Sequence, residues 1–170
     1  FTQSVVGGTV PKNFYPAVEK GLQDAMLKGV AGFPLVGLAA DLYDGSYHDV
    51  DSDELSFRTA AQMAYKDCLT KASPVLLEPI MAVEVVTPAE NQGDIMGDLN
   101  RRRAMVKNME HKGAECVLTA DVPLAEMFGY STDIRTLSKG LASYSMEPSH
   151  FEQVPPNLVA QIVKARGGNN

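Results

Sequence analysis

The order of predicted elements in the second half of the chain constrains its fold more than any other feature. Apolar and polar residues alternate from residue 78, with the period of a half-buried strand. Thr87-Pro88-Ala89-Glu90 then forms a typical helix start, with Thr87 as N-cap and Glu90 closing a capping box. The predicted elements are, in order, a strand over 78–86, a helix over 87–102, strands over 104–110 and 114–121, a helix over 123–139 interrupted near Gly129, and a strand over 141–147. This order predicts a ferredoxin-like βαββαβ domain, a sheet with two helices on one face.

The first half is predicted to form a smaller unit of the order strand, helix, strand, helix. Its elements are a strand over 1–6, a turn over 11–14, a helix over 16–28, a strand over 35–43 and a helix over 53–71. The last helix has a stripe of mostly small residues that we expect to pack on a sheet, namely Phe57, Ala60, Ala61, Ala64 and Cys68. The short Lys71–Pro74 segment is the best candidate linker. The fold class is therefore α+β, with domains over 1–73 and 74–170, the second including a helix over 156–166.

A compact polar loop, Gly45–Ser52, separates the second strand of the first half from its last helix. The loop carries one aromatic ring, Tyr47, one imidazole, His48, and several carboxylates. Such a turn cannot be a core element, so we interpret it as a tip that meets a partner. Asp51 is the expected N-cap of the following helix, and the spacing of the carboxylates does not match a calcium-binding loop.

Composition excludes several classes of function. The net charge of −6 argues against a general nucleic-acid binder, so any RNA contact must come from local basic clusters. No apolar run is long enough to span a membrane, and no motif of a phosphate-binding loop is present. Cys68 and Cys116 form no CxxC pair, so we expect two reduced, largely buried thiols and no metal site.

Several long motifs follow one another along the chain with preserved spacing. They are GSYHDVDS at 45–52, KASPVLLEPIMAVEVVTP at 71–88, GDLNRRR at 97–103, VPLAEMFGYSTDIRTLSKG at 122–140 and SYSME at 143–147. These motifs resemble the C-terminal part of bacterial elongation factor G, the ribosomal translocase GTPase. The resemblance implies that residues 1–73 are most of domain IV, a truncated fold of the ribosomal protein S5 domain 2-like type, and that residues 74–170 are domain V.

The resemblance also implies a function. The parent factor promotes GTP-dependent translocation of tRNA and mRNA on the ribosome in the cytoplasm. GTP and magnesium belong to a domain that this segment lacks, so we expect no catalysis and no cofactor here. The implied tip residues in the decoding region are Gly45, Ser46, Tyr47, His48 and Asp49, and the implied rRNA-binding residues are Arg101, Arg102, Arg103, Arg135, Thr136 and Lys139. Because consecutive arginines fan around a helix, we expect one of Arg101–Arg103 to pack and two to face phosphates.

The same residues also have simpler interpretations that require no partner. By itself, His48 is a solvated loop residue, and Arg101–Arg103 are cations that stabilise a helix C-terminus. Leu141 and Pro148 stand where the family usually carries an arginine and an aromatic residue, so a paralogue specialised for ribosome recycling is an alternative. A different class is a ferredoxin-like regulatory module for a small ligand, although no convergent polar cluster is present. The truncated first half is also expected to expose a strand edge near 35–43, through which two copies form a dimer.

Overall fold

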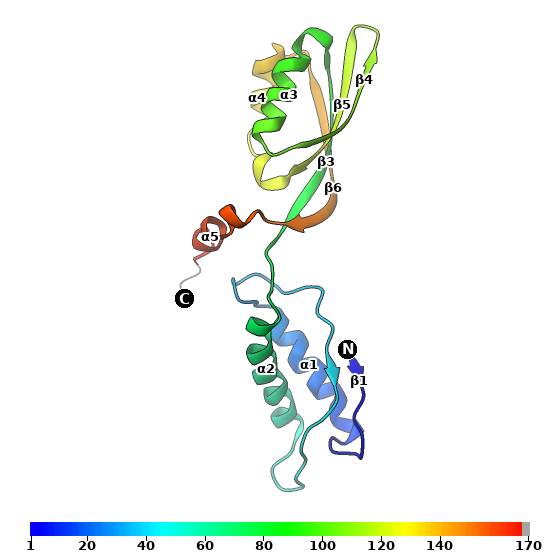
Figure 1. Cartoon of the computed structure of the whole chain (residues 1–170), viewed down its shortest axis with the longest axis vertical. Helices are drawn as coiled ribbons and strands as arrows, with labels where there is room; N and C mark the ends of the chain where they lie inside the picture. Colours follow the sequence, from blue (N-terminus) through cyan, green and yellow to red (C-terminus); the bar gives the residue numbers. More distant parts are fainter. Residues whose placement is uncertain (168–170) are drawn as a thin grey trace. The chain divides into compact units, whose positions relative to one another are not determined.

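The computed structural model describes residues 1–167 and contains two compact units (Figure 1). Unit 1 comprises residues 1–75 together with the described residues from Pro156 onward, and unit 2 comprises residues 76–155. The expected division at residues 73 and 74 puts the last helix in the second domain. In the structure, the end of this helix contacts residues of unit 1: the Arg166 guanidinium lies over the Phe33 ring at 4.2 Å and donates to the Gly32 carbonyl. None of the helices in residues 1–167 is both long and apolar enough to cross a membrane.

Unit 2 is a four-stranded antiparallel sheet with two helices, which confirms the predicted ferredoxin-like order (Figure 1). Its strands are β3 (Leu77–Pro88), β4 (Met105–Lys112), β5 (Glu115–Pro123) and β6 (Ser143–Gln153). Its helices are α3 (Gln92–Arg101) and α4 (Tyr130–Ser138), preceded by the 3-10 turns η2 (Ala89–Asn91) and η3 (Leu124–Glu126). The strand order β4-β5-β3-β6 puts β3 and β5 at the centre of the sheet.

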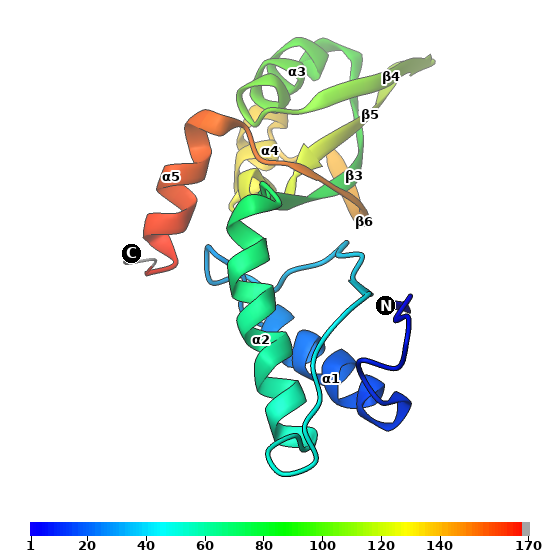
Figure 2. The same cartoon turned by 60° about the horizontal axis from the view of Figure 1, so that its bottom comes forward.

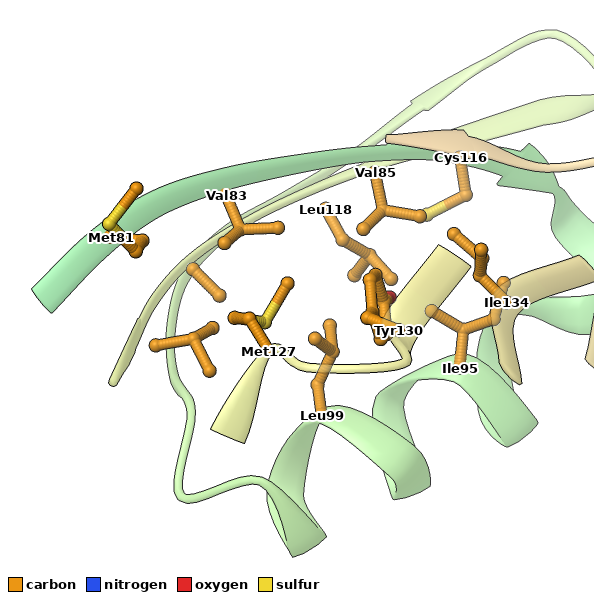
Figure 3. Packing of buried hydrophobic residues seen from close by; sticks show 12 residues of the cluster. Met81, Val83, Val85, Ile95, Leu99, Cys116, Leu118, Met127, Tyr130 and Ile134 are labelled. Carbon is orange, nitrogen blue, oxygen red and sulfur yellow. The ribbon is translucent and has the colours of Figure 1, made fainter. Parts of the chain in front are cut away.

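The core of unit 2 lies between the sheet and its two helices (Figure 3). Val83 and Val85 of β3 point toward the helices, whereas Ala82 and Glu84 are exposed, so the predicted alternation is confirmed. The helices contribute Ile95 and Leu99 from α3 and Tyr130 and Ile134 from α4, all almost fully buried. Burying an aliphatic side chain of this size contributes about 1.5–3 kcal/mol, so this layer is the main source of stability in unit 2.

The start of α3 differs from the prediction. Thr87 does not cap a helix, because it remains in β3, where it pairs with Cys116 of β5 and is only 1% exposed. Sheet pairing therefore outweighs the local capping signal. The helix begins five residues later, after η2. The expected interruption at Gly129 is confirmed, since this residue adopts φ +77° between η3 and α4.

Unit 1 is built on a pair of helices, α1 (Tyr15–Met26) and α2 (Glu54–Lys71). Its other elements are β1 (Thr2–Gln3), η1 (Lys12–Phe14), β2 (Asp41–Leu42) and the terminal helix α5 (Pro156–Ala165). Gly21 allows α1 and α2 to approach closely, because a Cβ at this position would lie 2.5 Å from the carbonyl oxygen of Arg58. The order strand, helix, strand, helix is as predicted.

The strands of unit 1 are much shorter than predicted. Among the described residues of unit 1, only β1 and β2 form, pairing in parallel over two residues each, whereas strands over 1–6 and 35–43 are expected from the sequence. Gly37 adopts φ +70°, which interrupts the extended backbone before β2. An alternating sequence becomes a strand only where a partner strand satisfies its backbone groups, and the described residues offer β2 a partner only over two positions.

The buried face of α2 also differs from the stripe of this helix that was expected to pack on a sheet. The buried residues of this helix are Ala61, Tyr65 and Leu69. The other members of the predicted stripe line an open apolar groove of about 560 Å³, together with Val18 and Leu38. Cys68 lies on this groove and is exposed, so the expectation of two buried thiols holds only for Cys116.

The N-cap of α2 is Asp53 rather than the predicted Asp51. The Asp53 carboxylate accepts a hydrogen bond of 2.7 Å from the Ser56 backbone N–H. Hydrogen bonds from the Ser56 side chain and backbone hold the pKa of Asp53 below its ordinary value. The cap lies later than expected because the turn also ends later, with Asp51 still in it.

Two helical glycines of the chain give a matched test of helix packing. Gly21→Ala should lower the free energy of unfolding of unit 1 by about 1–3 kcal/mol, because the added methyl overpacks the contact with α2. Gly97→Ala in α3 should instead stabilise unit 2 by about 0.4–1 kcal/mol, since its Cβ would meet nothing within 4 Å. Denaturant unfolding of the wild type and both variants measures the two changes. Equal effects of the two substitutions would contradict the close approach at Gly21.

Candidate functional site

The loop Gly45–Ser52 lies at the end of unit 1 where α2 begins (Figure 2). Two hydrogen bonds close it into a turn: the His48 backbone N–H donates to the Ser52 hydroxyl at 2.9 Å, and the Ser52 N–H donates to the His48 carbonyl at 3.0 Å. His48 is exposed at this turn, and its side chain makes no hydrogen bond or ion pair with any described residue. The expectation that this loop is a surface tip is therefore met by its exposure.

An aromatic cluster fixes the base of the tip loop. The Phe14 ring, at the end of η1, stacks on Phe57 of α2 with a centroid distance of 4.6 Å. The same ring meets Tyr47 of the loop at 5.8 Å. Gly45 lies so close to Val10 that an added Cβ would be 2.5 Å from its Cγ2 atom. Contacts with Phe14 and Val10 thus hold the loop from two sides. The sequence analysis assigns no role to Phe14, because this residue belongs to none of the motifs.

The tip is acidic. Residues 44–54 contain Asp44, Asp49, Asp51, Asp53 and Glu54 and no lysine or arginine. A hydrogen bond to the Asp49 carboxylate raises the pKa of the Tyr47 hydroxyl. Within residues 1–167, no group of three or more His, Cys, Asp or Glu side chains is arranged to hold a metal ion. The loop can therefore offer a partner an imidazole, a phenol and backbone groups, and a phosphate contact must come from elsewhere.

The three consecutive arginines of unit 2 lie at the end of α3, and two of them point inward. Arg102 is 12% exposed; its Nε donates to Asp98 at 2.8 Å, and its guanidinium pairs with Asp133 and lies over the Tyr130 ring at 4.9 Å. Arg103 donates two hydrogen bonds to the buried Glu78 carboxylate, at 2.7 and 3.0 Å.

Arg103 also bonds to Glu126 at 3.0 Å, and its hydrogen bonds to Glu78 raise the pKa of its guanidinium. Only Arg101 points outward, with a side chain 75% exposed and one contact to Asp98. The expectation of one packed and two outward arginines is therefore wrong. The carboxylates that draw Arg102 and Arg103 inward come from β3, α3, η3 and α4, and this clustering is a consequence of the fold.

The remaining predicted site residues lie on α4 and at its end. Arg135, Thr136 and Lys139 are all exposed. Thr136 donates its hydroxyl to the Thr132 carbonyl at 3.1 Å, so it binds its own helix. Lys139 ends the helix with φ +54°, and no described residue forms an ion pair with Lys139 or Arg135. Both cations are thus available to an anionic partner.

Comparisons with known proteins agree with this arrangement. A family model described as elongation factor G, domain IV, matches residues 1–73, and one described as elongation factor G C-terminus matches residues 75–162. Among solved structures, a crystal structure of a protein from Thermus thermophilus covers the whole chain with 42% sequence identity and a TM-score of 0.90. The chain spans 26% of the length of that protein.

The two units in this order define part of a translation factor. The chain belongs to the elongation factor G family. The family that the motifs predicted is thereby confirmed, as is the pair of small α/β units.

The inward arginines predict a clear difference in stability. Arg103→Gln should lower the free energy of unfolding of unit 2 by about 3 kcal/mol, because it leaves the Glu78 carboxylate, only 9% exposed, without its charged partner. The matched change Arg101→Gln should cost less than about 0.5 kcal/mol, as is usual for exposed sites. Denaturant unfolding measures both. Equal losses would show that the Arg103–Glu78 pair contributes nothing beyond a surface ion pair.

Proposed function

We propose that this chain is the ribosome-contacting part of an elongation factor G and promotes the translocation of tRNA and mRNA through the loop Gly45–Ser52. One observation carries the proposal: an exposed polar loop is fixed by a stack of aromatic rings, and its histidine has no partner within residues 1–167. An exposed tip at the end of a helical pair, with the His48 side chain free of partners among residues 1–167, suits insertion into a narrow RNA site. In this proposal the tip enters the decoding region of the small subunit behind the moving tRNA.

The tip acts by occupying space and by contacting exposed bases. His48 and Tyr47 carry planar rings that can stack on unpaired bases or hydrogen-bond to their edges. A contact made only after the tRNA has moved favours the translocated state and hinders its return. Because the loop is held by Phe14 and Gly45, little conformational entropy is lost when it binds.

Unit 2 supplies the second contact, an anchor to large-subunit rRNA. The exposed cations Arg101, Arg135 and Lys139 are suited to phosphate oxygens, and Thr136 follows Arg135 on α4. Arg102 and Arg103 serve this contact indirectly, because their carboxylate partners hold the α3–β4 turn that directly follows Arg101. With few outward cations on an acidic chain, binding by the chain alone should be weak at physiological salt and should weaken further as salt rises.

Catalysis is not assigned to this chain. The mechanism proposed here needs positioning and stacking alone, and it assigns no nucleophile, metal or cofactor to these 170 residues. GTP hydrolysis would belong to the part of a complete factor that the chain does not span.

The decisive experiment changes His48 in an intact elongation factor G whose corresponding segment is replaced by these 170 residues. His48→Ala should slow translocation about five- to 150-fold, the effect of losing a base contact of ~1–3 kcal/mol. Single-round GTP hydrolysis and ribosome binding should change little, because the loop serves neither. Stopped-flow translocation beside quench-flow hydrolysis measures the two rates.

A control is Val36→Ala, a 68% exposed side chain of unit 1 outside the loop, which should leave both rates unchanged. Equal losses in translocation and hydrolysis for His48→Ala would assign His48 to binding or folding. No loss in either rate would leave His48 as a solvated loop residue and overturn the proposal.

By itself the chain should self-associate through unit 1. β1 and β2 each leave one edge without a partner among the described strands, and the neighbouring groove is lined mainly by apolar side chains. Leu38→Lys places a charge on that groove and should shift the chain toward monomer, whereas Val36→Lys, 68% exposed and outside the groove, should not. Sedimentation velocity over a range of concentrations measures the state. A strict monomer at every concentration would contradict the expectation.

A further inference from the structure

The tip loop has the wrong charge for the partner proposed above. RNA presents a phosphate backbone, and affinity for it comes largely from lysine and arginine. Residues 44–54 carry five carboxylates and no such cation. The Asp53 carboxylate accepts a hydrogen bond from the Ser56 backbone N–H, and the Tyr47 hydroxyl bonds to Asp49, but neither contact supplies a cation to the loop. A cation near the loop is therefore needed to bring its rings against RNA.

The turn η1 lies beside the loop and carries such a cation. Phe14, the last residue of η1, contacts the Tyr47 ring, and Tyr47 precedes His48. A 3-10 turn advances about 2 Å per residue, so Lys12 at the start of η1 lies close to Phe14. Lys12 and Asn13 are both exposed, and both views show the chain before α1 at the same end of unit 1 as the tip loop (Figures 1 and 2).

Lys12 is also the cation that internal pairing leaves available at this end. The other two basic residues on the nearby parts of α1 and α2 are Lys20 and Arg58, and both pair with Asp24. Lys12 forms no ion pair or side-chain hydrogen bond within residues 1–167. Within residues 1–167 the charge of Lys12 is therefore not paired with a carboxylate, in contrast to the charges of the inward arginines of unit 2.

We propose that η1 and the loop Gly45–Ser52 form one composite RNA-binding tip, in which Lys12 contacts a backbone phosphate while Tyr47 and His48 contact bases. Phe14 is the positioning residue of this tip, because its ring joins the two segments and fixes their spacing. The inference rests on the proposed function of the loop and adds the phosphate contact that the loop itself lacks. Neither Lys12 nor Phe14 belongs to the motifs that first pointed to the loop.

The test again uses the intact factor that carries these 170 residues. Lys12→Ala should slow translocation roughly five-fold, the effect expected from one charge-assisted contact. It should also reduce the slope of log affinity for the ribosome against log salt by about 0.7–0.9, because one fewer counterion is released. Lys12→Arg should retain both properties. Lys28→Ala is the matched control, since Lys28 is exposed just beyond the opposite end of α1 and should change neither.

The outcomes separate this inference from the function on which it rests. If His48→Ala slows translocation but Lys12→Ala behaves as Lys28→Ala does, the loop acts alone and the composite tip is wrong. If Lys12→Ala slows translocation with the salt slope unchanged, its effect is structural and the phosphate contact is wrong. If neither His48→Ala nor Lys12→Ala has an effect, both the proposed function and this inference fall.

Discussion

The ring of Phe14 makes the contacts on which the shape of the loop end of unit 1 depends. It stacks on Phe57 of α2 and meets Tyr47 of the loop, so one side chain joins η1, α2 and the loop. Two aromatic pairs of this kind contribute roughly 1–3 kcal/mol beyond the area they bury. The polar tip has no core of its own, and its shape is therefore set by an apolar contact at its base.

Unit 2 uses its charges in the opposite way. Arg102 and Arg103 form ion pairs with a network of carboxylates from β3, η3, α3 and α4. Breaking such buried ion pairs strongly lowers the free energy of unfolding, so the network holds the α3–β4 turn in place. The motif Arg101–Arg103 thus contributes one outward cation, Arg101, and two arginines with a structural role. An acidic chain can in this way still present a cation at its surface.

Sequence patterns predicted the parts of the molecule that depend on neighbours along the chain. The alternation in β3, the Gly129 break and the presence of the helices follow from local periodicity and turn chemistry, whereas the start of α3 is set by sheet pairing at Thr87. The 35–43 alternation had the same local signal and failed, since strand formation there needs a partner that pairs over only two residues. The arginine orientations and the role of Phe14 could not be predicted from the sequence, because apart from Asp98 the groups they contact lie 23 to 43 residues away along the chain.

The close approach of Gly45 to Val10 limits how this end of the molecule can vary. Any side chain at position 45, alanine included, would enter the space of the Val10 methyl group. The constraint is that position 45 has no room for a side chain. Chemical similarity between amino acids would therefore be a poor guide to which replacements at position 45 are tolerated. A smaller residue at position 10 would be the natural compensation, so the two positions should change together when relatives diverge. Their covariation would record a steric contact rather than a shared ligand.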